Sequence, residues 1–428
     1  MKLTALKDEV VIGEKEVRDL INVFSSEASS LKLSYTKYSG KVPILDRSFK
    51  DETLVNNKLP NDFRGEIIDQ IIAYLVGKPV TYTYEDEENE KTLELLKYWR
   101  KRNNIHVVDI GLVKLMSCCG RAGRLFYLND GNIMVINVEP WKYIPIWRDC
   151  EIIAVIYYYT VYDEKAETVI KAEVYDNTNV TVYQESENGY VICKETVAHG
   201  FDRVPFIEID NNDEQLSDFE KVGALIDAYD SAVSDMQNEI EEHRIAYQVF
   251  ENCKITPADK INARATGAYS VPKGGKISYL TKDLHGTYVK EHLDRMEENI
   301  YKFSKTVNMS DEKFSGNTQS GVSRKWKLLT LEFRATIKQL AFVQGLLKQF
   351  EIFEYIWNAR GAKFEYLDMD YKFTRNIPME LTEAAETAGK LKGIVSNRTI
   401  LEGMPQVSDV DAEIERLDEE GEFIDDLE

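Results

Sequence analysis

The sequence predicts an α+β subunit in which unusually long helices accompany a region of antiparallel hairpins. Two observations lead to this prediction. Apolar residues recur every three or four positions over long stretches on both sides of a short polar loop, which indicates helices that pack along one side. Residues 123–209 instead alternate with a period of two and are interrupted by turn residues, which indicates strands.

Helices of this length have three common explanations: a coiled coil, a helical repeat, or a subunit that spans a large assembly. The long helices differ from one another in sequence, and we find no internal repeat of about 20 to 50 residues. We therefore favour a subunit of a large assembly.

The first 215 residues are expected to form the α+β domain. Its helices are expected at Glu14–Ser29, Pro60–Gly77, Thr92–Arg102 and His106–Cys119. Its strands are expected at Val80–Tyr84, Arg124–Leu128, Ile133–Val138, Ile152–Val161, Ala172–Tyr175, Val180–Gln184 and Tyr190–Val197. Glycine-containing turns at 129–131 and 187–189 join two pairs of these strands into hairpins.

The rest of the chain is expected to be mainly helical, with one turn-rich insertion. Its expected elements are a helix of about 50 Å over Phe219–Phe250, the insertion 251–285, a helix over Val289–Val307, a helix of about 60 Å that includes Trp326–Trp357, a strand over Phe364–Phe373, and helices Thr382–Leu391 and Ser396–Glu402. We expect the strand to rejoin the sheet of the first domain.

Composition limits the class of protein. With 428 residues, of which 43% are hydrophobic, the chain can bury a substantial core in two or three domains. Its net charge is −21, and nearly half of this excess lies in Ser408–Glu428. An acidic protein gains no affinity for duplex DNA from bulk counterion release, so a protein that grips a DNA groove is not expected. A conduit that lets DNA slide past is compatible with this charge.

We expect a protein made in a cytosol, because acidic residues near the N-terminus exclude a signal peptide. The longest apolar run, Ile152–Tyr159, is far shorter than the ~20 residues that a membrane span requires. The cysteines have no CxxC spacing, and we expect each of them to be a small buried hydrophobic residue: Cys118, Cys119, Cys150, Cys193 and Cys253.

No segment predicts catalysis or metal binding. Gly316–Ser323 has the glycine spacing of a phosphate-binding loop, but Val322 stands where the lysine is needed and a helix precedes the loop. We interpret it as a flexible loop, and Gly120–Arg124 as the entry to a hairpin. His285 and His292 are seven residues apart, which does not fit zinc chelation on a helix. We expect no catalytic residue, no cofactor and no metal.

Several blocks of the sequence, in order, resemble the portal proteins of tailed double-stranded-DNA bacteriophages, siphovirus type. The resemblance extends over roughly residues 40 to 420. The blocks that carry it are Asn56–Pro60, Ile68–Gln70, Tyr74–Pro79, Glu208–Glu214, Ser217–Glu220, Asn308–Asn317, Ser320–Val322 and Thr374–Pro378.

The resemblance implies a portal-type subunit, usually in a ring of twelve copies at a capsid vertex of the virion. Duplex DNA is packaged through the channel of this ring and later ejected. The implied parts are a wing (1–215), a stem helix (216–250), a clip (251–285), a second stem helix (286–307), a tunnel loop (308–319), a long wing helix (320–360), a strand returning to the wing (361–380), and a short crown with an acidic tail (381–428).

The resemblance also implies the partners: the terminase large subunit, the major capsid and scaffolding proteins, a head-completion or adaptor protein, and the DNA, but no membrane. The implied channel-facing residues are Ser310, Asp311, Glu312, Lys313, Ser315, Gly316, Asn317 and Thr318. Small polar groups and one cation can touch phosphates without holding them. A solvated turn is the alternative for this loop. A non-enzymatic helical scaffold or adaptor of lower symmetry, or an NTP-using enzyme, is the alternative for the protein.

Overall fold

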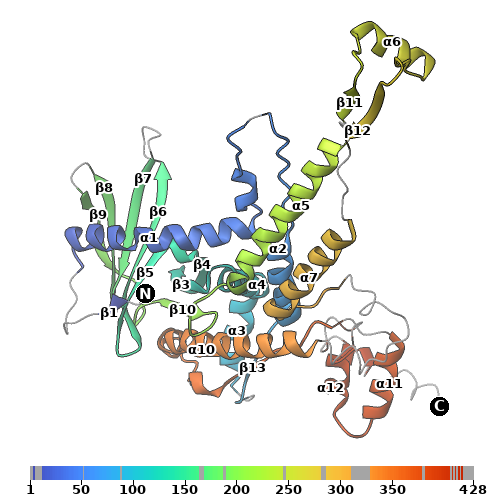
Figure 1. The fold of residues 1–428 in the computed structure, drawn as a ribbon. Coiled ribbons are helices and arrows are strands. Elements are labelled where there is room, and N and C mark those ends of the chain that lie inside the picture. The colour runs from blue at the N-terminus through green and yellow to red at the C-terminus, as the bar shows by residue number, and fades with distance from the viewer. Residues whose placement is uncertain are drawn as a thin grey trace. The chain divides into compact units, whose positions relative to one another are not determined.

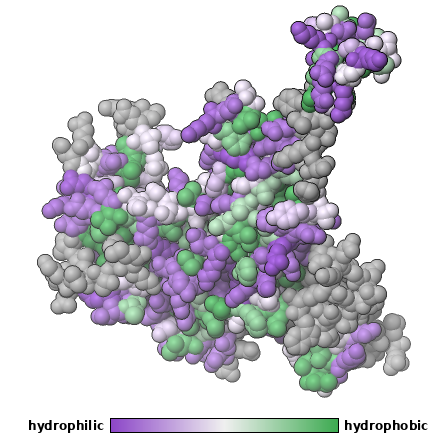
Figure 2. Space-filling model, in the orientation of Figure 1, coloured by the Kyte–Doolittle hydropathy of each residue, from purple (hydrophilic) through white to green (hydrophobic). Residues whose placement is uncertain are grey.

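The computed structural model describes residues 3–4, 12–51, 53–86, 89–162, 168–186, 189–243, 247–280, 286–309, 328–377, 381–404, 407, 410, 413–414 and 416–417. The chain divides into two compact units, Met1–Thr374 and Arg375–Glu428. The first unit contains both helices and sheets, which confirms the predicted α+β class (Figure 1). No described helix is long and apolar enough to cross a membrane. The visible described surface is largely polar, with separate apolar areas (Figure 2).

A six-stranded sheet forms one part of the first unit. Its strands follow the order β1 (Leu3–Thr4), β5 (Tyr143–Arg148), β6 (Glu151–Tyr162), β7 (Thr168–Tyr175), β8 (Asn179–Ser186) and β9 (Gly189–Ala198). β1 pairs in parallel with β5, and the other pairs are antiparallel. Helix α1 (Glu14–Tyr38) covers one face, where its Val17 and Phe24 are buried with residues of the sheet.

A second sheet has the order β10 (Phe206–Asp210), β3 (Arg121–Asn129) and β4 (Asn132–Val138), and all its pairs are antiparallel. The long helix α10 (Leu329–Ala359) packs against β10. The approach is close at Gly345, where a Cβ atom would lie 2.3 Å from Cδ1 of Ile209. The helix therefore requires a residue without a side chain at this position or a shift of Ile209.

Aromatic residues hold the C-terminal half of α10 in the core. Phe350 and Phe353 pack against Trp99 of α3 (Glu90–Arg102), and Trp357 packs against both phenylalanines. Phe364 joins them, with its ring centroid 4.8 Å from that of Trp357. After Phe364 the chain passes through the 3-10 helix η4 (Tyr366–Asp368) into a short strand, β13 (Met369–Lys372).

The predicted strand Phe364–Phe373 is thus too long, because Phe364 belongs to the aromatic cluster. β13 pairs antiparallel with β2 (Thr81–Tyr84) in a separate two-stranded sheet. The strand thus returns to a strand of residues 1–215, as expected, but it joins neither the six-stranded nor the three-stranded sheet.

A helical core lies beside the sheets. It is formed by α2 (Phe63–Val76), α4 (Ile105–Cys119), the 3-10 helix η3 (Glu220–Val222), α5 (Gly223–His243) and α7 (Gly286–Ser304). Buried Phe63 and Ile67 of α2 meet Ile226 of α5 and Ile300 of α7 there. The carboxylate of Asp62 caps α2 by accepting a hydrogen bond from the backbone N–H of Gly65 at 3.0 Å. Two further 3-10 helices are η1 (Pro43–Asp46) and η2 (Pro140–Lys142).

A row of polar residues on α5 holds the extended segment 57–61. The side chains of Asp230, Ser234 and Asn238 are four residues apart and lie on one face of the helix. They accept backbone N–H bonds from Asn61 at 2.9 Å, Leu59 at 3.0 Å and Asn57 at 2.7 Å. The helix therefore satisfies backbone donors that the segment cannot satisfy itself. Burial raises the pKa of the Asp230 carboxyl above its usual range.

The predicted helix Phe219–Phe250 ends too late, since α5 ends at His243. Tyr247–Glu251 forms β11, which pairs antiparallel with β12 (Lys276–Leu280). The aromatic and β-branched residues of β11 fit a hairpin as well as they fit a helical stripe. The insertion also contains an unpredicted helix, α6 (Pro257–Thr266), which Thr256 and Asp259 cap reciprocally.

The cysteine prediction is correct only for Cys118 and Cys119, which are buried. Burial raises the pKa of the Cys119 thiol to about 12. Cys150 and Cys193 are exposed, and Cys253 is half-buried. Cys150 lies in the turn between β5 and β6, and Cys193 lies on the edge strand β9.

The second unit contains α11 (Leu381–Leu391) and α12 (Asn397–Glu402), which confirms both helices predicted there. The side-chain oxygen of Ser396 caps α12 by accepting from the backbone N–H of Thr399.

A substitution at Gly120 tests how closely the backbone at Gln215 approaches the end of α4. Gly120 has a φ of +83°, and a Cβ atom there would lie 1.9 Å from the backbone oxygen of Gln215. We expect Gly120→Ala to lower the free energy of unfolding by more than about 3 kcal/mol, because backbone strain and a backbone clash add. The control is Gly40→Ala, which has a φ of +88° with nothing near its Cβ. It should cost only about 1–2 kcal/mol in urea unfolding; equal losses would contradict the close approach.

Candidate functional site: the anchors of residues 310–327

All the predicted channel-facing residues, from Ser310 to Thr318, lie outside the described residues, as does the glycine-spaced stretch Gly316–Ser323. The structure describes the chain up to Met309 and again from Leu328. The candidate site is therefore built from the two ends that hold this segment.

Helix α2 contacts both ends through one row of polar side chains. Glu66, Gln70 and Tyr74 are four residues apart and so share one face of the helix. Glu66 Oε2 accepts a hydrogen bond from the hydroxyl of Tyr301, near the end of α7, at 2.7 Å. The hydroxyl of Tyr74 donates to Oε2 of Glu332, in the first turn of α10, at 2.6 Å. A single rigid helix thus connects the elements on either side of residues 310–327.

Gln70, between them, binds the backbone that leaves α7. Its amide nitrogen donates to the carbonyl oxygen of Val307 at 2.7 Å, and its amide oxygen accepts from the N–H of Val307 at 3.1 Å. The side-chain amide therefore pairs with this residue as a neighbouring strand would. The next residue, Asn308, donates to Oε1 of Glu297 in α7 at 2.7 Å.

A buried lysine fixes the first half of α10. Lys338 is only 1% exposed, and its ammonium lies 2.9 Å from Oδ2 of Asp218. It also donates to the hydroxyl of Ser117 in α4 at 2.7 Å and to the side-chain oxygen of Asn211. All three donor positions of the ammonium are used, which is the condition for burying such a charge. Burial lowers the pKa of Lys338, against the opposing attraction of Asp218.

Arg334 brings α7 to the same carboxylate. Its guanidinium lies 2.8 Å from Oδ1 of Asp218 and donates to the backbone oxygens of Asp218 and Ser304. Ser304 is the last residue of α7. Burial alone would raise the pKa of the Asp218 carboxyl, but Lys338 and Arg334 outweigh it and hold this pKa well below its usual range.

A second buried network fixes the middle of α10. Arg124 of β3 is fully buried and lies 2.7 Å from Oδ1 of Asp109 in α4. It also donates to the side-chain oxygen of Gln349 at 2.8 Å. The hydroxyl of Tyr82 donates to the other oxygen of Asp109 at 2.5 Å. Both networks therefore connect α10 to α4, one through Lys338 in the first half of α10 and the other through Gln349 in its second half.

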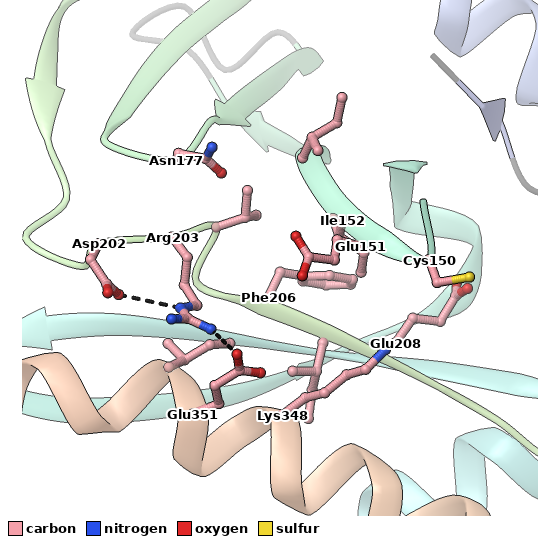
Figure 3. Close-up of a pocket in the computed structure, with 14 residues that line it drawn as sticks. Cys150, Glu151, Ile152, Asn177, Asp202, Arg203, Phe206, Glu208, Lys348 and Glu351 are labelled. Carbon is pink, nitrogen blue, oxygen red and sulfur yellow. Dashed lines mark hydrogen bonds and ion pairs between the residues drawn. The ribbon is translucent and has the colours of Figure 1, made fainter. Parts of the chain in front are cut away.

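The close-up in Figure 3 shows a hollow of about 380 Å³ beside α10. Three of its charged groups engage one another: Arg203 forms ion pairs with Asp202 and with Glu351 of α10. Across residues 12–51, 53–86 and the other described stretches, no group of three or more His, Cys, Asp or Glu side chains could hold a metal ion.

Sequence reasoning did not assign a role to the anchor residues, and two signals could have found some of them. Gln70 and Tyr74 belong to blocks that carried the resemblance, and the spacing of Glu66, Gln70 and Tyr74 marks one polar row on α2. The position of Lys338 in a row with Leu331, Ala335, Phe342 and Leu346 indicates the buried face of α10. The sequence does not indicate its partner, because Asp218 lies 120 residues away.

Comparisons with known proteins point in one direction. A family model described as phage portal protein, SPP1 Gp6-like, matches residues 18–426. The portal protein of Bacillus phage SPP1 is 26% identical over 395 residues, which cover 86% of this chain and 77% of that protein. The portal protein of Clostridium phage phiCD119 is 24% identical over 443 residues, which cover 94% of this chain and 95% of that protein.

We expect Lys338→Met to lower the free energy of unfolding by about 3 kcal/mol at pH 7, because it leaves a buried carboxylate with one cation instead of two. Lys348→Met is the control on the same helix. Lys348 is exposed and its ammonium lies 5.6 Å from the ring centre of Trp147, so its loss should cost less than about 1 kcal/mol. Equal losses in urea unfolding would contradict the role of the buried pair.

The effect should also depend on pH. The folded-state pKa of Asp218 lies below the unfolded value of about 3.9, so its contribution to stability is complete above about pH 5. That contribution is lost as the pH falls through 4 toward the folded-state pKa. The difference between wild type and Lys338→Met should therefore shrink below about pH 4. A difference that stays constant to pH 2 would show that Asp218 is not the partner.

Proposed function

This chain belongs to the SPP1 Gp6-like family of phage portal proteins, and from this premise we propose how its parts act in a ring of twelve copies. A portal protein is a component of the virion, set at a capsid vertex, and double-stranded DNA is packaged through the channel of its homo-oligomeric ring. The single observation that carries this function is the family match over residues 18–426, nearly the whole chain.

Within the ring, we assign the segment 308–319 to the channel as a tunnel loop. The row Glu66, Gln70 and Tyr74 supports this assignment, since it holds both ends of a segment that contains the loop. A loop that meets moving DNA needs rigid ends, because it can transmit or resist force only if its base does not yield. Lys313, Ser315, Asn317 and Thr318 are the residues we assign to its tip.

We assign the remaining parts as the resemblance implies. The wing consists of residues 1–215, the helix 320–360 and the strand at 361–380. The stem consists of 216–250 and 286–307, and the clip of 251–285. The crown and its acidic tail are formed by 381–428. The terminase large subunit docks on the clip during packaging, and a head-completion or adaptor protein replaces it afterwards, before ejection. The chain itself performs no bond chemistry in this proposal, because the terminase supplies the ATP-driven work.

Native mass spectrometry with negative-stain imaging of the purified protein tests this function. We expect closed rings of about a dozen copies with a hole wide enough for a DNA duplex, which is roughly 20 Å across. A protein that stays monomeric or dimeric at high concentration and moderate salt would favour the helical scaffold instead. Stabilisation by nucleotide in thermal unfolding would favour the NTP-using enzyme.

The loop assignment has its own test, Lys313→Ala in a packaging reaction with the terminase. We expect intact rings and an amount of packaged DNA that differs from wild type, because the tip loses the one cation that can touch the phosphates. The control Lys15→Ala removes the same charge from the exposed start of α1 and should package normally. Normal packaging by Lys313→Ala would contradict contact between this lysine and DNA.

A further inference from the structure

An exposed apolar patch lies beside the anchors of residues 310–327. It consists of Phe303 at the end of α7 and Phe333, Ile337 and Leu340 of α10, which are 57%, 57%, 55% and 61% exposed. The α10 members are four and three residues apart, so they share one face of the helix, opposite the buried Lys338. Phe303 and Ile337 line one hollow of about 310 Å³, which makes the patch continuous between the two helices.

The patch continues into a second, larger hollow. Ile337 and Leu340 also line a space of about 570 Å³, whose opposite wall includes Trp147 and Asp149. Figure 2 shows apolar residues between polar ones in the region that α10 occupies in Figure 1. Clustered side chains of this size, each more than half exposed next to two hollows, are typical of an interaction surface.

Charge indicates which partner fits this surface. Lys221 and Lys305 line the smaller hollow together with Asp213 and Glu214, so its rim carries both signs. The chain as a whole has a charge of −21, and two copies repel each other unless they meet where charge is locally balanced. Duplex DNA is excluded, because an apolar patch with a balanced rim offers it neither counterion release nor donors.

The position of the patch also favours a second copy of this chain as the partner. In a ring, copies approach one another most closely near the axis. If residues 308–319 reach the channel, their base lies near the axis, and surface exposed there faces a neighbouring copy. Phe303 precedes the loop by a few residues and Phe333 follows it.

We propose that the patch Phe303, Phe333, Ile337 and Leu340 is one side of the contact between neighbouring copies of this chain, at the base of the loop. The contact is heterologous: the patch of one copy meets a different surface of the next, which is what closes a ring rather than a dimer. This inference rests on the proposed function.

The test compares Ile337→Asp and Leu340→Asp with wild type by native mass spectrometry. We expect wild type to form rings and both variants to remain monomers or short oligomers. Their circular dichroism and monomer unfolding should be unchanged, because neither residue is buried in the single chain. Tyr355→Asp is the matched control: it lies 18 residues, or five turns, beyond Ile337 on the same face of α10 and is 52% exposed. It should leave the rings intact.

Each result separates the two proposals. Rings in both patch variants, or loss of rings in Tyr355→Asp as well, would overturn the interface while leaving the portal function in place. A wild type that forms no rings would overturn the function itself. Patch variants whose monomer is destabilised would also overturn the interface, because the chain's own residues would then cover the patch.

A second measurement avoids introducing charge. In rings, a thiol at Leu340→Cys should be at least tenfold slower to react with a maleimide than one at Tyr355→Cys, as peptide mapping would report for each cysteine separately. Equal reactivity in intact rings would overturn the interface.

Discussion

The arrangement of the first unit depends on keeping the carboxylate of Asp218 ionised in the interior. The carboxylate lies between two cations, Lys338 and Arg334. Lys338 also binds Ser117 of α4, and Arg334 also binds Ser304 of α7. Through them α4, the end of the β10 segment, the start of the α5 region, α7 and α10 meet at one point. A buried charge tolerates little displacement of its partners, because each lost contact leaves an uncompensated ion. The cluster of Asp218, Lys338 and Arg334 thus constrains the positions of these elements as much as it stabilises the fold.

Polar interactions also decide how α10 can cross the fold. Apolar packing alone would let a long helix slide or rotate on its sheet, since hydrophobic contacts have no direction. Hydrogen bonds to Lys338 and Gln349, about three turns apart, fix both its rotation and its register against α4. The aromatic cluster beyond Gln349 then fills the remaining volume around Trp99.

Much of this fold could be predicted from the sequence where one signal dominates. α2, α3 and α4 have clear apolar stripes and stop signals, and they lie close to their predicted bounds. β5 was missed because both faces of the strand are buried, so its residues do not alternate. β10 has only five residues and was missed although Ile207–Asp210 alternates. The anchors of residues 310–327 were missed for another reason: Lys338 and Gln70 acquire their roles only from segments more than 100 residues away.

The ladder between α5 and the segment 57–61 has a mechanical consequence. Its three backbone bonds, to Asp230, Ser234 and Asn238, are spaced along the helix axis. A pull along that axis loads all three together, in shear, so they must break at once. A pull away from the helix would open them one at a time and needs less force. The segment 57–61 is therefore held more strongly against sliding along α5 than against lifting away from it.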